Sequence, residues 1–113
     1  CEEVLKIMRQ DSGNDILELK VDGGATSNGL LMQMQADISN CKVNSAVIQE
    51  TTVLGAAFIA GIGSGIWDSV SDIAAMWQSQ TVYTPFMKET ERNRKLNEWS
   101  KAVATSKTWA SQL

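Results

Sequence analysis

Apolar residues recur at helical spacing in three stretches of the chain, and polar or glycine-rich segments separate them. Side chains three or four positions apart lie on one face of an α-helix, so each stretch presents one apolar stripe. Ser12-Gly13-Asn14 ends the first stripe, and the second ends near Asn40. The pattern predicts helices over residues 1–12, 29–40 and 88–107, marked by the stripes Val4-Leu5-Met8, Leu31-Met34-Ile38 and Leu96-Trp99-Val103.

A strand is predicted over residues 16–21, where Leu17, Leu19 and Val21 alternate with polar side chains. Residues 41–48 form a weaker strand candidate, and residues 81–83 are expected to be extended. Strands that alternate with helices are typical of an α/β layer with parallel strands. Two strands do not form a stable sheet alone, so further strands are expected from outside this chain or from a second copy.

The segment VLGAAFIAGIG is predicted to be a helix built largely from small residues. Its glycines indicate either close approach to a neighbouring backbone or a helix that ends between Gly63 and Gly65. A short helix is expected to follow over residues 67–77. The four tryptophans are expected to pack the C-terminal helices onto the rest of the domain, because large aromatic side chains dominate cores. They are Trp67, Trp77, Trp99 and Trp109.

Composition narrows the possible chemistry. The 113 residues are 43% apolar and 20% charged, which fits one domain and argues against disorder. The net charge of −3 indicates no basic surface for nucleic acid or an anionic membrane. The chain has no histidine, which excludes histidine triads, histidine metal ligands and a histidine general base. Cys1 and Cys41 indicate neither a zinc motif nor a disulfide framework, so both are expected to be free thiols.

The stretch VDGGATSNG joins the first strand to the next helix through a glycine turn. Gly23 and Gly24 carry no Cβ, so a flat ligand could lie against the backbone, and Asn28 could donate and accept hydrogen bonds at the helix start. The turn is not a P-loop, since no Lys-Ser/Thr pair follows the glycines, and it lacks the three glycines of the dinucleotide fingerprint. Taken alone, it favours a tight turn without a ligand.

The order of several motifs is more specific than the turn. VDGGATSNGLLMQMQADI, followed by ETTVLGAAFIAGIGSGIW, YTPF and ERNRKLNEWSKAV, resembles the C-terminal part of the glycerol kinases, in the sugar-kinase family of the actin-like ATPase superfamily. The resemblance runs over nearly the whole chain. It implies an α/β fold: a partial actin-like ATPase (ribonuclease H-like) domain with few parallel strands and C-terminal helices. Gly29 stands where that family commonly has a larger residue.

The resemblance also implies a function for the turn. Gly24 would place its backbone against the adenosine of ATP or ADP, Asn28 would hydrogen-bond near the adenine, and Gly23 and Ala25 would line the same wall. Residues 1–113 would form the C-terminal portion of the second, nucleotide-binding domain. The catalytic base, the glycerol contacts and most of the Mg²⁺ and phosphate ligands would lie elsewhere, so this piece carries no catalytic or metal residue and is expected to be inactive alone.

Two alternatives stay open: a non-catalytic module that self-associates, and a piece of another sugar or polyol kinase. A chain that opens inside a helix without an initiator methionine is expected to be cut from a longer one. The intact enzyme would act on glycerol and ATP, as a homo-oligomer, without nucleic acid or membrane. It is expected in the cytoplasm, although Ser111-Gln112-Leu113 resembles a peroxisomal address.

Overall fold

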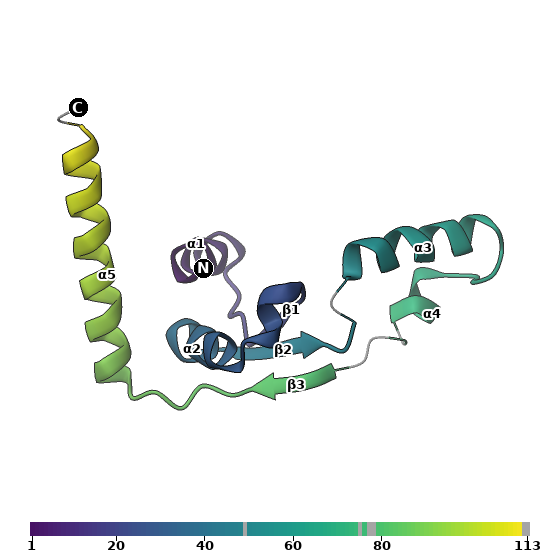
Figure 1. Ribbon diagram of the computed structural model, residues 1–113, viewed down its shortest axis with the longest axis horizontal. Helices are drawn as coiled ribbons and strands as arrows, with labels where there is room; N and C mark the ends of the chain where they lie inside the picture. Colours follow the sequence, from purple (N-terminus) through teal and green to yellow (C-terminus); the bar gives the residue numbers. More distant parts are fainter. Residues whose placement is uncertain (49, 75, 77–78, 112–113) are drawn as a thin grey trace.

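The structure of the protein is a computed structural model, which describes residues 1–48, 50–74, 76 and 79–111 (Figure 1). Helices and strands alternate in the first half, as the sequence predicts. The elements in chain order are α1 (Glu2–Ser12), β1 (Glu18–Val21), the 3₁₀ turn η1 (Gly24–Ser27), α2 (Gly29–Ser39), β2 (Lys42–Ala46), α3 (Thr51–Gly63), α4 (Val70–Ala74), β3 (Ser79–Tyr83) and α5 (Glu89–Ala110).

The sheet has three strands in the order β1-β2-β3. β1 and β2 are parallel, with Glu18 opposite Lys42, and α2 connects them. The predicted parallel pair is therefore confirmed. β3 runs antiparallel to β2, with Tyr83 opposite Val43. The extended segment predicted at residues 81–83 is thus part of a strand of this sheet. The third strand comes from the chain itself, whereas further strands were expected from outside the chain or from a second copy.

The core lies between α2 and the middle of the sheet. Val43 in β2 is fully buried against Met32 and Ala36 of α2. Leu19, Val21 and Tyr83, one or two from each flanking strand, pack around them. This alignment follows from the pleat, which sends alternate side chains of each strand toward the helix.

The molecule is open around this small core. Its radius of gyration is 18.3 Å, whereas a compact domain of this length has about 13 Å. Figure 1 shows α3 and α5 reaching away from the sheet on opposite sides. The predicted packing of the tryptophans is wrong for two of them, since Trp99 and Trp109 on α5 are 60% and 66% exposed. Trp77 lies outside the described residues.

The end of α3 confirms the predicted boundary. Gly65 adopts a positive φ of 78°, and its N–H donates to the Ile62 carbonyl while the Ile66 N–H donates to the Gly61 carbonyl. This pair of hydrogen bonds is the Schellman motif, in which glycine adopts the left-handed backbone conformation. Trp67 then folds back over Gly61 and meets Phe58 edge to face, with ring centroids 5.3 Å apart.

Two helix boundaries differ from the prediction. The helix expected over residues 67–77 begins later, because the Ser69 backbone N–H and hydroxyl both donate to the Asp72 carboxylate and set the start of α4. α5 continues beyond residue 107 to Ala110. Among the described helices, none has the length and apolar character needed to cross a bilayer.

Candidate functional site

The glycine turn lies between the end of β1 and the start of α2, as the sequence predicts. Gly23 has a φ of 89°, a conformation that side-chain-bearing residues rarely adopt. Its carbonyl accepts hydrogen bonds from the Thr26 N–H at 3.0 Å and from the Thr26 hydroxyl at 2.7 Å. Thr26 is buried, so its side chain fixes the turn from inside the molecule.

Gly24 has no such structural requirement. Its φ lies outside the left-handed region, and a Cβ built on it would meet no atom of the described chain within 4 Å. A Cβ at Gly23 would also point into open space. The outer side of the turn is therefore an unobstructed backbone surface, and Ala25 beside it is exposed. Neither packing nor conformation within the described chain explains why residue 24 is glycine.

Asn28 begins α2. Its Oδ1 accepts a hydrogen bond from the Leu31 N–H at 3.1 Å, the geometry of a helix N-cap. Its Nδ2 donates to no other described residue, and the side chain is exposed. The sequence indicates that Asn28 could both donate and accept hydrogen bonds at a ligand. The Oδ1 uses one of its two lone pairs for the helix cap, while the Nδ2 donor points away from that bond and is open to a ligand.

The four predicted site residues, Gly23, Gly24, Ala25 and Asn28, lie within one turn of chain. Tyr83 is a neighbour that the sequence analysis did not place there. A Cβ at Gly29 would lie 3.4 Å from the Tyr83 hydroxyl oxygen, so the ring of Tyr83 occupies the space beside Gly29. A Cβ at this distance would make an ordinary van der Waals contact, so Tyr83 packs beside the start of α2 without requiring glycine at position 29. The sequence places Tyr83 at the end of a predicted extended segment. The residues around it do not predict that this segment pairs with β2.

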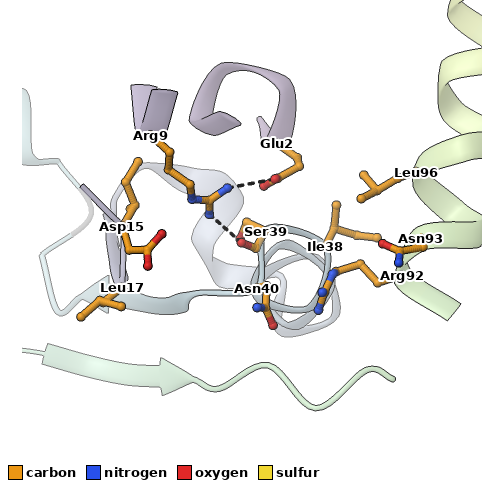
Figure 2. A pocket seen from close by; sticks show the side chains of 11 residues that line it. Glu2, Arg9, Asp15, Leu17, Ile38, Ser39, Asn40, Arg92, Asn93 and Leu96 are labelled. Atoms are coloured by element: carbon orange, nitrogen blue, oxygen red, sulfur yellow. Dashed lines mark hydrogen bonds and ion pairs between the residues drawn. The ribbon is translucent and has the colours of Figure 1, made fainter. Parts of the chain in front are cut away.

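Two cavities of the described chain are lined by residues outside this turn. Figure 2 shows one of about 380 Å³ near the far end of α2, where Arg9 donates to Glu2 at 3.0 Å and to the Ser39 carbonyl at 2.8 Å. The bond to Ser39 joins α1 to the last turn of α2, and the bond to Glu2 lies within α1 and orients the guanidinium. A larger apolar groove of about 730 Å³ lies between α1, α2 and α5 and is lined by Leu31, Met34, Ile38, Leu96 and Trp99.

The chemistry available at the turn is binding rather than bond making. The N-terminus of α2 carries a partial positive charge, and its side chains offer a neutral donor. No group of three or more Asp, Glu or Cys side chains that could hold a metal occurs within the described residues. Cys1 is exposed and Cys41 buried, both as free thiols, as expected.

Comparison with known proteins gives consistent matches. Residues 1–64 match the C-terminal domain of the FGGY family of carbohydrate kinases. The glycerol kinase of Agathobacter rectalis is 50% identical over 108 residues, which are 96% of this chain and 22% of that protein. The glycerol kinase of Deinococcus radiodurans is 47% identical over 107 residues, 95% of this chain and 21% of that protein. The chain thus spans about a fifth of the length of these relatives.

Solved structures agree with the sequence matches. The crystal structure of Plasmodium falciparum glycerol kinase with ADP superposes with a TM-score of 0.77 at 35% identity, over 92% of this chain and 21% of that one. A xylulose kinase from Lactobacillus acidophilus gives a TM-score of 0.68 at 24% identity, over 82% of this chain and 19% of that one, which shows the shared fold.

Proposed function

Because the chain belongs to the FGGY family of carbohydrate kinases, we propose that it is part of an ATP-dependent glycerol kinase and supplies the adenosine side of its nucleotide site. The open backbone surface at Gly23 and Gly24 is the observation that carries this proposal. Its relatives at 50% and 47% identity are glycerol kinases, which favours glycerol over other polyols as the substrate. We place the intact protein in the cytoplasm. Two residues of the ending that resembles a peroxisomal address, Gln112 and Leu113, lie outside the described residues.

In this proposal, the residues of the turn bind and orient the nucleotide. The adenosine lies against the backbone of Gly23, Gly24 and Ala25, and the Asn28 Nδ2 donates to a ring nitrogen of the adenine. The space above Gly23 and Gly24 is open, and it lies next to an amide donor that the helix cap holds in place. Fixing one end of ATP helps hold its γ-phosphate in line with the acceptor hydroxyl, and positioning is most of what phosphoryl transfer requires.

The remaining machinery is assigned to parts of the protein outside this chain. Mg²⁺ would neutralise charge on the phosphates when bound, and a carboxylate base would accept the proton of the glycerol hydroxyl. The described residues contain no cluster suited to Mg²⁺, so no residue of this chain is assigned to it.

Asn28→Asp in the full-length protein tests the adenine contact. The aspartate keeps an oxygen that caps α2 through the Leu31 N–H but replaces the Nδ2 donor by a second acceptor. We expect the KM for ATP to rise about tenfold, since a lost hydrogen bond facing a like acceptor costs about 1.5 kcal/mol. The kcat should change less than the KM, as measured by steady-state kinetics with varied ATP.

Asn28→Ser is the matched control for helix capping. Serine also caps helices well but places no donor at the position of Nδ2. Both variants should therefore melt near the wild type while both bind ATP more weakly. An unchanged KM for ATP in both variants would remove Asn28 from the site.

A second candidate function, a module that self-associates, is favoured by one observation. The groove between α1, α2 and α5 exposes Leu31, Met34 and Trp99 to 44%, 49% and 60%. Contiguous apolar surface of this kind favours association. We expect the isolated 113-residue chain to sediment as a dimer or larger species, in equilibrium with monomer on dilution. A monomer at all concentrations in analytical ultracentrifugation would exclude this candidate.

A further inference from the structure

A buried carboxylate in α2 fixes the chain that follows β3. Asp37 is only 4% exposed, and its Oδ1 accepts hydrogen bonds from the backbone N–H groups of Phe86 at 2.8 Å and Met87 at 3.1 Å. Gln33, one helical turn earlier, donates from Nε2 to the same oxygen at 3.3 Å and to the Thr84 carbonyl at 3.0 Å. Three of these four bonds are made to backbone groups of residues 84–87, so they specify the path of the segment.

The same face of α2 continues to the candidate site. Gly29, Gln33 and Asp37 are spaced by four residues and therefore form one stripe along the helix. Along this stripe Gly29 lies beside Tyr83, Gln33 binds Thr84, and Asp37 binds Phe86 and Met87. The connecting segment (residues 83–87) thus runs along the stripe in the same direction as α2.

The lengths of the two elements agree. Eight residues of α-helix rise about 12 Å, and four steps of extended chain span about 13 Å. The extended connecting segment is therefore just long enough to contact α2 continuously from Gly29 to Asp37. A shift of the segment at the Asp37 end would be passed along it to Tyr83 at the other end. Tyr83 lies beside Gly29, the residue that follows Asn28.

We propose that Asp37 is a positioning residue for nucleotide binding, because it holds the connecting segment in register and so keeps Tyr83 against the start of α2. The proposal rests on the proposed function for its ligand. The connecting segment leads directly into α5. A change in the position of α5 would therefore also change the adenosine site. Asp37 acts through Tyr83 and the helix start and does not touch the nucleotide.

The test compares Asp37→Ala and Asp37→Asn in the full-length protein. ADP affinity is measured by titration calorimetry, and backbone order by hydrogen exchange of residues 28–32 and 84–87. We expect Asp37→Ala to weaken ADP about tenfold, since two backbone donors lose a charged acceptor. Asp37→Asn keeps an oxygen acceptor and should weaken ADP by about threefold. Exchange should rise in both segments, and kcat at saturating ATP should stay near the wild type.

Asp72→Ala is the matched control. Asp72 also accepts a hydrogen bond from a backbone N–H, that of Ser69 at 3.0 Å, but on the exposed helix α4. It should alter exchange near residue 69 and leave ADP affinity unchanged. If Asp37→Ala does not fold, Asp37→Asn decides the question through the same two measurements.

The outcomes separate the two proposals. Faster exchange at residues 84–87 with unchanged exchange at residues 28–32 and unchanged ADP affinity would overturn the positioning role. Faster exchange at residues 28–32 supports the coupling even without nucleotide. If the wild-type protein failed to bind ADP while this exchange still rose, the proposed function would fail and the coupling within α2 would stand.

Discussion

Gly24→Val is expected to weaken ADP and ATP binding strongly while the protein keeps its fold. The new side chain would project into the space where we place adenosine, and a forced overlap costs about 1–3 kcal/mol, which weakens binding by about five- to a hundredfold. The fold should tolerate it, because the backbone at Gly24 needs no positive φ and a Cβ there meets nothing within 4 Å. Calorimetric titration of the full-length variant with ADP, alongside its melting temperature, measures both effects.

Two other glycines serve as controls for Gly24. Gly55 lies on α3 with equally open surroundings, so Gly55→Val should leave ADP affinity unchanged. Gly23 has a φ of 89°, so Gly23→Val should lower the melting temperature as well as the affinity. Wild-type ADP affinity in Gly24→Val would show that the nucleotide does not lie on this surface.

Val43→Asp is expected to unfold the sheet. Val43 is fully buried in a core cluster whose other buried members are Met32 and Ala36, and no cation lies among the residues packed around it in the described chain. Burial of an unpaired carboxylate costs several kcal/mol, against a total stability of about 5–15 kcal/mol for a domain. Circular dichroism and a cooperative denaturant transition report the loss directly.

Val82→Asp is the matched control in the neighbouring strand. Val82 pairs with Asn44 in the same sheet but is 48% exposed, so its carboxylate would reach water. We expect this variant to retain a cooperative transition close to that of the wild type. If Val43→Asp also retained one, the cluster around Val43 would not be the core that stabilises the sheet.

Local signals account for what the sequence predicted well. The alternation of Leu17, Leu19 and Val21, the glycine turn and the apolar stripe of α2 all lie within residues 17–38. Thr26, Ser27 and Asn28 all offer capping side chains before α2, and the Oδ1 of Asn28 is the atom that caps the helix. The four predicted site residues also belong to this unit, so one short segment determines their relative positions.

Non-local contacts account for what the sequence did not predict. The pairing of β3 with β2 and the bonds of Asp37 to Phe86 and Met87 join residues far apart in the chain, and periodicity says nothing about them. The exposed Trp99 and Trp109 show a further limit. Apolar periodicity identifies the face of a helix that is fit for packing, but not the surface that covers it.

The sheet also shows where the chain can change in length. Ala46, the last residue of β2, pairs with Ser79, the first of β3, so the intervening residues leave and re-enter the sheet at neighbouring points. Closing a loop costs only about 0.6 kcal/mol more for each doubling of its length. Evolution could therefore lengthen, shorten or replace the segment that contains α3 and α4 without disturbing the β1-α2-β2 unit or its turn. In engineering terms, this junction is the natural place to insert a reporter domain.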